Sequence, residues 1–365
     1  MIVNPIMVFQ TMRVFSSSFS EYFPGDPLFL KLDSVKQPPL PYNYFYKDCS
    51  FSNMVSRPVS YYSDIEIKIM FENCLFYNCT ANNKQVGGAF YINIPNGGCV
   101  FLRTCASCCQ TESSYQLGYV YAHPDCHNNF VFSSFEKCSI DLVGYPYSLS
   151  LNSGMQSINN MNSSKNTGSQ MSGFYSSSPN PLMFKYNTIS NINNTNGYSV
   201  YITGNTGFLK YSNFVDFKIP TSVLYTIYLS GGYVMEYCII KSWQNFAIYG
   251  GTSLIVRFCY FDKTVNQTTG SFVFQNSYPN TATYVLEHFS TAMCIAQNPA
   301  YPPQTPHPSA TQFNQNPENI CQTLPPPPTP AQTIPQDNTL SGASLTSLGS
   351  IMRIFAVSFI HIIYF

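Results

Sequence analysis

The sequence predicts an all-β protein and, within that class, a right-handed parallel β-helix. Aromatic residues make up 16% of the 365 residues and charged residues only 9%. Aromatic and β-branched side chains favour strands, while Asn and Gly favour turns. Short alternating strands also recur with similar corners along the middle of the chain, at spacings in the twenties. Such a period is typical of solenoids.

The repeat is clearest between residues 209 and 256. Leu209, Val234 and Val256 mark successive rows, at spacings of 25 and 22 residues. Each row holds an alternating strand, a polar corner with Asn or Cys, a second strand and Gly-rich turn residues. One row cannot bury its own apolar face, but stacked rows bury a continuous core. A β-sandwich also has many short strands, but matching corners at a steady period favour the solenoid.

Three local expectations follow from this alignment of rows. Asn side chains at equivalent corners of successive coils should bond to one another as a ladder. Cys238 and Cys259 occupy equivalent points of consecutive rows and should stack, either as a disulfide or as a column of thiols. The stretch from Ser153 to Asn180 is so rich in Ser and Asn that a frayed coil or a loop is expected there.

Three motifs carry a resemblance to a known family. Residues 71–79 read Phe-Glu-Asn-Cys-Leu-Phe-Tyr-Asn-Cys and residues 87–89 read Gly-Gly-Ala, while residues 22–27 read Tyr-Phe-Pro-Gly-Asp-Pro. These motifs resemble polymorphic outer-membrane-protein-like surface proteins and the large β-helix families of trichomonad-type protists, over roughly residues 21–296. The resemblance implies a right-handed β-helix on a surface protein with an adhesin-like role.

The chain divides by composition into five segments. Residues 1–20 have the apolar run and small-x-small site of a signal peptide, with a first strand as the alternative. We expect an N-terminal cap over 21–60, the β-helix over 61–296 and a Pro-rich linker over 297–340. Residues 341–365 form an apolar tail directed to a membrane, as a lipid-anchor signal or a short membrane helix.

Thirteen cysteines, nine of them between Cys49 and Cys138, are typical of an oxidising compartment in which disulfides persist. Cys105, Cys108, His123 and Cys126 have the bare spacing of a tetrahedral zinc site. Disulfides that link neighbouring coils are the simpler interpretation of Cys99, Cys105, Cys108, Cys109, Cys126 and Cys138. A column of free buried cysteines is a third interpretation. We therefore expect no metal and no cofactor.

The sequence also predicts where the protein acts and on what. Sequons at Asn78, Asn162, Asn193 and Asn266 are candidate glycosylation sites. Together with the cysteines and the tail, they predict a membrane-tethered protein at the cell surface. A net charge of zero gives no field to attract nucleic acid. The expected partners are a cell-surface glycan or protein ligand and, through the tail, a membrane.

The function predicted from these features is non-enzymatic: an extended face presented for adhesion or recognition. The alternative is a polysaccharide-active, pectate-lyase-like enzyme on the same fold, which would need carboxylates meeting at one groove. Asp216 and Asp262, with Glu236 and Arg257 between them, are the residues that could line one face, although solvated charges are the plainer interpretation. The only tryptophan, Trp243, is either a platform for a sugar or a packed aromatic.

Overall fold

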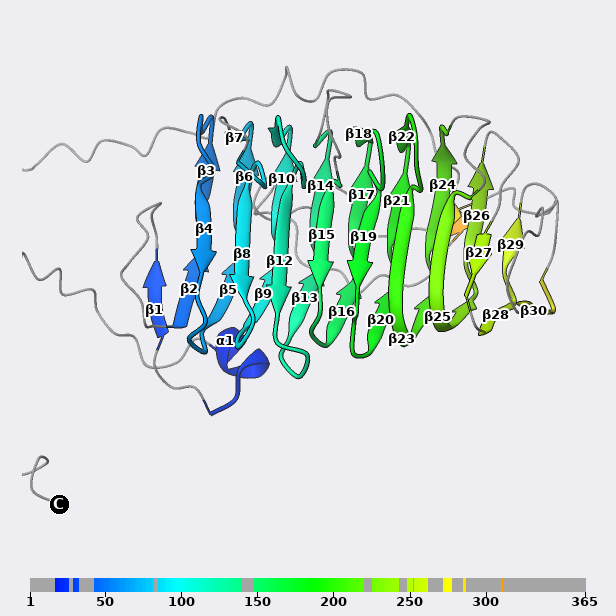
Figure 1. Ribbon diagram of the computed structural model, residues 1–365, viewed down its shortest axis with the longest axis horizontal. Coiled ribbons are helices and arrows are strands. Elements are labelled where there is room, and N and C mark those ends of the chain that lie inside the picture. Colours follow the sequence, from blue (N-terminus) through cyan, green and yellow to red (C-terminus); the bar gives the residue numbers. More distant parts are fainter. Residues whose placement is uncertain are drawn as a thin grey trace, which may run out of the picture. The chain divides into compact units, whose positions relative to one another are not determined.

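A computed structural model shows the chain as a parallel β-solenoid (Figure 1). The structure describes residues 17–25, 29–32, 43–81, 85–138, 147–219, 225–242, 248–251, 253–261, 272–277, 285–286 and 310–311. Within these ranges one helix is present, α1 (Ser17–Tyr22). All strand pairs in the stack are parallel, and the one antiparallel pair is β31 (Val285–Leu286) with β32 (Ala310–Thr311). The predicted solenoid is thus confirmed.

Each coil contributes a strand to three parallel ladders. Ladder 1 holds β4 (Val59–Tyr62), β8 (Phe90–Ile94), β12 (Gly118–Ala122), β15 (Leu149–Asn152), β19 (Phe174–Ser177), the first halves of β23 (Val200–Lys210) and β25 (Ile227–Glu236), and β27 (Ile248–Gly250). Ladder 2 holds β1 (Phe29–Leu32), β2 (Asn43–Lys47), β5 (Lys68–Glu72), β9 (Gly98–Leu102), β13 (Asn128–Val131), β16 (Gln156–Asn159), β20 (Leu182–Lys185), the second halves of β23 and β25, β28 (Ser253–Arg257) and β30 (Phe272–Gln275).

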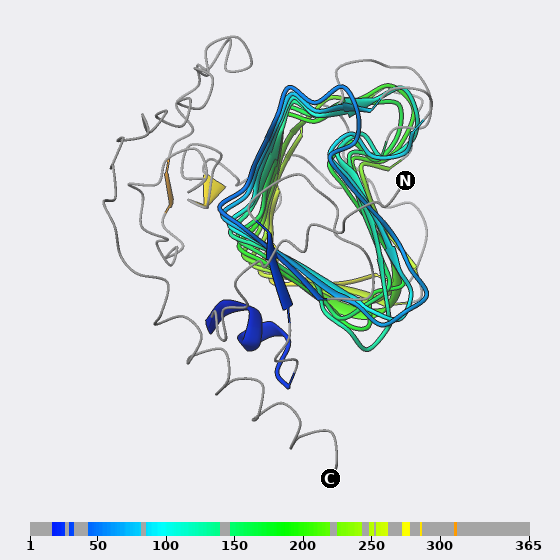
Figure 2. The same ribbon diagram turned by 90° about the vertical axis from the view of Figure 1, so that its left-hand side faces the viewer.

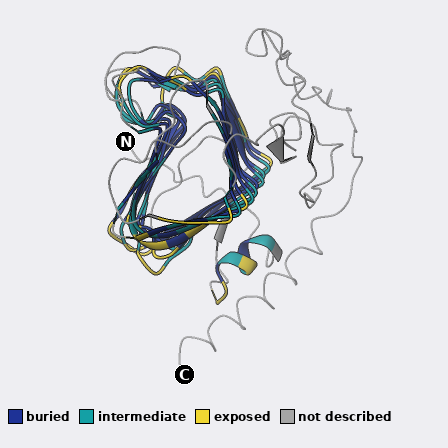
Figure 3. Cartoon of the chain, turned by 90° about the vertical axis from the view of Figure 1, so that its right-hand side faces the viewer, coloured by how far each residue is buried: buried dark blue, intermediate teal, exposed yellow. Residues whose placement is uncertain are grey.

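Ladder 3 holds nine strands: β3 (Ser50–Ser52), β6 (Leu75–Tyr77), β10 (Cys105–Ser107), β14 (Ser134–Glu136), β17 (Asn162–Ser164), β21 (Thr188–Ser190), β24 (Asn213–Phe217), β26 (Ile239–Ser242) and β29 (Tyr260–Phe261). Two short pairs follow it, β7 (Thr80–Ala81) with β11 (Gln110–Thr111) and β18 (Thr167–Gly168) with β22 (Asn193–Asn194). Viewed along the stack, the coils superimpose as a ring (Figure 2), and its buried residues line the walls (Figure 3).

The register places one apolar column of ladder 2 inside the ring. Its members are Tyr46, Phe71, Phe101, Phe130, Ile158, Phe184, Leu209, Met235 and Val256. Leu209 therefore pairs with Met235, whereas Val234 pairs with Phe208 on the outer side. The sequence alignment of rows was wrong by one residue at Val234, because an apolar residue also occupies the outward position there.

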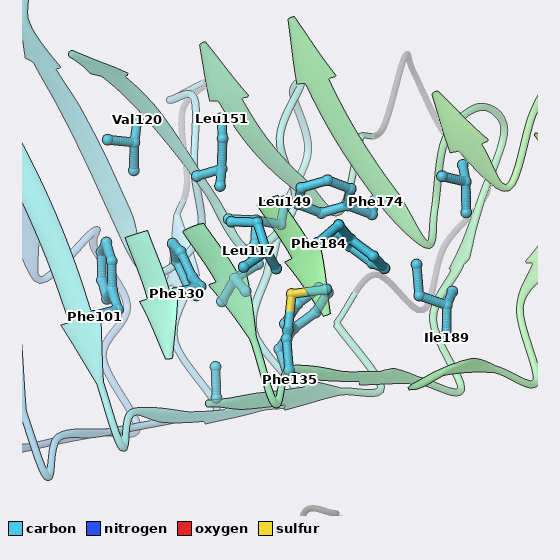
Figure 4. Packing of buried hydrophobic residues seen from close by; sticks show 14 of the residues in the cluster. Phe101, Leu117, Val120, Phe130, Phe135, Leu149, Leu151, Phe174, Phe184 and Ile189 are labelled. Carbon is cyan, nitrogen blue, oxygen red and sulfur yellow. The ribbon is translucent and has the colours of Figure 1, made fainter. Parts of the chain in front are cut away.

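Aromatic rings stack through the core of the first coils, and Figure 4 shows the end of this stack, where Phe101 faces Phe130. The Phe71 ring centroid lies 4.7 Å from that of Tyr46 and 4.7 Å from that of Phe101, and Phe101 lies 4.2 Å from Phe130. Parallel strands in register repeat at about 4.8 Å. The coil spacing itself therefore sets the distance between successive rings.

The corner between ladders 2 and 3 explains the recurring Asn and Cys of the sequence. A residue with positive φ turns the chain, as at Asn73 (φ 54°), and a small polar residue then faces inward, as at Cys74. The Cys74 thiol donates to the Glu72 carbonyl at 3.4 Å and to the Tyr46 carbonyl of the preceding coil at 3.5 Å. Thiols at Cys238 and Cys259 repeat both contacts.

The predicted Asn ladder is found between two coils, and an Asn–Asp bond takes its place at a second corner. Asn78 donates from Nδ2 to Oδ1 of Asn53 at 2.8 Å, at the corner after ladder 3. Asn73 donates in the same way to Asp48 at 2.9 Å, at the corner before it.

The expectation of a frayed coil or loop from Ser153 to Asn180 is wrong. Strands β16, β17 and β19 occupy this stretch and pair in register with both neighbours. Several of its Ser, Asn and Gln side chains point inward and form hydrogen bonds, as where Ser176 Oγ donates to Gln156 Oε1 at 2.7 Å. A polar sequence therefore fills the ring here without an apolar period.

Stacked strands occur at β2 and β3, within the segment 21–60 that the sequence predicts to be a cap. α1 lies outside the ring, where Phe19 and Phe23 pack on the outer face of ladder 2 (Figure 2).

Among the described residues, no helix is long and apolar enough to cross a membrane. The predicted signal segment before residue 17, the tail 341–365 and, apart from Ala310–Thr311, the linker 297–340 lie outside those residues.

Candidate functional site

The outer face of ladder 1 carries a column of tyrosines that are paired across successive coils. Its members are Tyr91, Tyr119, Tyr175, Tyr201, Tyr228 and Tyr249. Ring centroids are 4.5 Å apart between Tyr201 and Tyr228 and 4.4 Å apart between Tyr228 and Tyr249, with the planes nearly parallel. Only one coil interrupts the column, where Ser150 lies between Tyr119 and Tyr175.

A second set of tyrosines flanks the column in the segments that lead into ladder 1. These are Tyr115, Tyr147, Tyr198 and Tyr225. Tyr147 fills the interruption, because its ring lies 5.1 Å from Tyr115 and 4.8 Å from Tyr175. Ring contacts therefore continue from Tyr91 to Tyr249, across six coil steps of about 4.8 Å, or roughly 29 Å. We call these ten residues the tyrosine face.

Strand alternation produces this face. Each tyrosine of the column stands between two buried residues that point into the ring, such as Val200 and Ile202 around Tyr201, or Ile227 and Leu229 around Tyr228. Because successive side chains of a strand point to opposite faces, a residue between two core positions must point outward. Stacked cross-strand aromatic pairs add about 0.5–1.5 kcal/mol each beyond their burial.

The stacking decides which atoms of the rings meet a ligand. Since the planes are nearly parallel along the column, each ring covers its neighbour's face, and a ligand would meet the ring edges. The next outward column reads Asn93, Tyr121, Asn152, Ser177, Thr203 and Ser230, and apart from the Tyr121 ring it is polar. Ser177 Oγ donates to Asn152 Oδ1 at 2.5 Å. The surface is thus rich in hydroxyl and amide groups.

The described residues of these two columns include no charged side chain. The nearest cation is Arg57 at one end, whose guanidinium lies 5.1 Å from the centroid of the Tyr91 ring. Burial, and secondarily its tyrosine neighbours, raises the pKa of Tyr201 to about 12. Burial also raises the pKa of Tyr119 and Tyr198. These phenols therefore stay protonated, and remain hydrogen-bond donors, at any physiological pH.

The residues of the predicted zinc cluster lie at different corners of the solenoid. Cys105 is in β10 and Cys108 follows it, and both are disulfide-bonded. His123 and Cys126 lie in the loop between β12 and β13. A disulfide sulfur is no thiolate ligand, and the described part of the chain holds no group of three His, Cys, Asp or Glu side chains placed to bind a metal.

Most of the other described cysteines are buried free thiols, which corrects the prediction of disulfides between coils. This group comprises Cys74, Cys79, Cys99, Cys109, Cys138, Cys238 and Cys259. Burial raises the pKa of the Cys99 thiol well above its usual value, so it stays protonated and unreactive. Cys238 and Cys259 stack as predicted, as thiols rather than as a disulfide.

The four sequons differ in accessibility. Asn78 and Asn193 are exposed, whereas Asn162 is only 6% exposed and its Nδ2 donates to Ser134 Oγ at 3.0 Å. The Asn162 side chain is therefore inaccessible to glycosylation in the folded chain. Asn266 lies outside the described residues, as do Asp262 and Trp243.

The carboxylates named for an enzymatic site have structural partners. Glu236 is buried, and its carboxylate pairs with Lys210 Nζ at 2.5 Å and with the Arg257 guanidinium of the next coil. Asp216 forms a corner of ladder 3 with φ 58°. Glu236 and Arg257 thus form an ion pair between coils.

Sequence reasoning missed the tyrosine face, although the signal was present. Tyrosine follows a core residue at the same place in row after row: Phe90-Tyr91, Phe174-Tyr175, Val200-Tyr201, Ile227-Tyr228 and Ile248-Tyr249. The rows were aligned on their apolar residues, and such an alignment does not reveal a tyrosine that recurs at an outward position.

Comparison with known proteins adds no assignment, because no family model, curated protein or solved structure matches this chain.

Proposed function

We propose that this protein is a non-enzymatic recognition protein whose tyrosine face binds an extended ligand at the cell surface. The continuous run of ten tyrosines carries the proposal. Tyrosine supplies a large contact area at a low cost in conformational entropy and offers a hydroxyl for specificity. A row of such side chains across successive coils suits a ligand that is itself long and periodic.

A neutral glycan is the ligand class that the chemistry of this face favours. A sulfated or acidic polymer would need cations along its path, and the two outer columns have none among the described residues. Phenol, amide and hydroxyl groups instead match the donors and acceptors of sugar hydroxyls. A polysaccharide repeats those hydroxyls with every sugar ring, so a chain laid along the stack would meet similar groups at each coil.

Three parts of the proposal rest on the sequence. Display at the cell surface and tethering through residues 341–365 follow from the proline-spaced apolar tail. The right-handed winding follows from the strong preference for right-handed crossovers between parallel strands.

Binding of the full chain to immobilised polysaccharides tests the proposal. The panel contains neutral β-glucans and mannans, together with sulfated and uronic-acid polymers. We expect binding to a neutral member, and about a tenfold loss in the double variant Tyr201→Ser, Tyr228→Ser. Screening by salt should leave this binding nearly unchanged, since no ion pair contributes.

The matched control is the double variant Tyr186→Ser, Tyr211→Ser. These rings also stack from coil to coil, 5.3 Å apart, but they stand at the corner between ladders 2 and 3. The control should bind like the parent chain. Equal losses in the two double variants, or no loss in either, would remove the tyrosine face as the binding site. Binding only to charged polymers would remove the neutral glycan.

A further inference from the structure

The outer face of ladder 2 carries a second column with an unusual composition. In register it reads Phe45, Met70, Val100, Asn129, Ser157, Met183, Phe208, Val234, Ile255 and Val273. These residues alternate with the core column and therefore point away from the ring. The column is apolar at both ends and polar for two coils between them.

At its first end, the chain itself covers this column. Phe19 and Phe23 of the α1 segment stand one helical turn apart and pack on Phe45, Met70 and Val100. The Phe19 ring centroid lies 5.9 Å from that of Phe45. All five side chains are almost fully buried as a result.

An ion cluster borders the α1 site. Lys47 Nζ lies 3.3 Å from Glu72 Oε2, and the Arg103 guanidinium pairs with the other oxygen of Glu72. The same lysine nitrogen lies 5.9 Å from the Phe45 ring. α1 joins the cluster through Ser18, whose hydroxyl donates to Glu72 at 2.8 Å.

The same arrangement recurs over three coils at the other end. Phe208 and Lys210 take the places of Phe45 and Lys47, and Val234 and Glu236 take those of Met70 and Glu72. In the third coil, Ile255 and Arg257 stand where Val100 and Arg103 stand, with the arginine one residue earlier.

The contacts recur together with the residue types. Lys210 Nζ lies 2.5 Å from Glu236 and 4.9 Å from the Phe208 ring, and Arg257 pairs with the second carboxylate oxygen. Here, however, three of the five apolar residues remain open, and Val234 and Ile255 are half-buried. Met183 and Phe208 are each 43% exposed and Val273 is 47% exposed. Five consecutive apolar residues on an outer column make a patch of the kind that marks an interaction site.

We propose that Met183, Phe208, Val234 and Ile255, with the Lys210–Glu236–Arg257 cluster, form a docking site for a short amphipathic helix from a partner protein. The helix presents two aromatic side chains one turn apart and a hydroxyl before the first, as α1 does. The occupant is inferred from continuity with the α1 interface on the same column and from the repeated charge arrangement. Helix docking in an apolar site commonly uses such spaced anchors.

A peptide with the sequence of residues 14–25 is the probe, because the intramolecular α1 occupies the first site and leaves only the second open. We expect its fluorescence anisotropy to rise on addition of the full chain. Phe208→Ser and Met183→Ser should each weaken binding about tenfold, as for loss of an anchor side chain. Tyr201→Ser, on the tyrosine face, should leave it unchanged.

Three outcomes would overturn the docking site. The peptide does not bind, it binds equally to Phe208→Ser, or a peptide with Ser at both Phe positions binds as well as the parent. Sedimentation of the chain alone gives a fourth test. Self-association that Phe208→Ser abolishes would assign the patch to a second copy in place of a partner helix. Circular dichroism of each variant confirms that the solenoid persists.

Discussion

Two parts of this solenoid fill nearly the same ring with different side chains. Between residues 44 and 135 the core is aromatic, with Phe71, Phe101 and Phe130 stacked from coil to coil. Between residues 148 and 199 it contains polar side chains with no exposure: Ser148, Gln156, Ser163, Asn166, Ser172, Ser176, Asn187 and Ser199. The three ladders continue through both parts without a break.

In the polar part, hydrogen bonds between buried side chains add to the packing of apolar residues such as Leu151, Ile158 and Phe184. Asn187 accepts the Met161 backbone N–H at 2.7 Å and donates to the Ile158 carbonyl at 2.9 Å. Asn166 similarly accepts the Cys138 N–H at 2.9 Å. Burying a polar group is costly unless it is paired, and most of these side chains are, although the Ser148 hydroxyl has no hydrogen-bond partner within the described residues. The three ladders therefore determine the path of each coil. The interior can be apolar or polar, provided that most of its polar groups form hydrogen bonds.

The largest effect should come from truncating a stacked ring. Phe101→Ala removes a side chain that contacts rings in both neighbouring coils, and we expect a loss of about 3–5 kcal/mol in the free energy of unfolding. Ile158→Ala, in the same column but within the polar part, is the matched variant and should cost less. Urea unfolding measures both. Equal costs would show that the stacking adds nothing to burial.

The aromatic part should also be the one that fails at high pH. Tyr46 and Tyr61 are buried and share a hydrogen bond of 2.5 Å. Burial raises the pKa of both well above 10. Their contribution is present below pH 10 and is lost as the pH rises above it, because only the unfolded chain ionises readily. At pH 11 the loss is about 1.4 kcal/mol for each tyrosine.

Hydrogen exchange resolves this alkaline effect along the chain. Between pH 9 and pH 11, amides of β2, β4 and β5 should lose protection before those of β16, β17 and β21. In the polar part, the described residues 147–199 include no fully buried tyrosine. Uniform loss of protection along the stack would mean that the solenoid opens as one unit. The aromatic and polar parts would then not differ in their stability at high pH.

The difference between the two parts also explains how much the sequence could predict. An apolar period makes rows visible where Phe and Leu face inward, so the solenoid and the stacking of Cys238 on Cys259 were predictable. From Ser153 to Asn180 polar inward residues such as Gln156, Ser163 and Ser176 are interspersed with apolar ones such as Ile158 and Phe174, so no regular hydrophobicity pattern distinguishes the stretch from a loop. Outward residues are not revealed by a hydrophobicity pattern either, because the core does not constrain them. The tyrosine face and the Phe208 column lie at such outward positions.

A smaller effect is expected from the polar corner itself. Asn187→Ala leaves the Met161 N–H and the Ile158 carbonyl without their partners inside the ring, which should cost about 1–3 kcal/mol. Asn187→Cys places there the thiol that Cys74 and Cys238 use to reach the preceding coil. This variant should recover part of the loss, measured by urea unfolding. If Asn187→Cys is as unstable as Asn187→Ala, the two kinds of corner are not equivalent.

The smallest effect should be that of exchanging one corner donor for another. Ser212 stands one coil before Cys238, and its hydroxyl donates to the Lys210 carbonyl at 2.9 Å as the Cys238 thiol donates to Glu236 at 3.3 Å. Cys238→Ser therefore preserves the bond and should change the free energy of unfolding by less than about 1 kcal/mol, within the range of one hydrogen bond. Cys238→Ala removes the donor and should cost more. If Cys238→Ser costs more than Cys238→Ala, the cysteine stabilises the corner through its apolar volume and not through its hydrogen bond. The corners of the two parts would then be stabilised by different interactions.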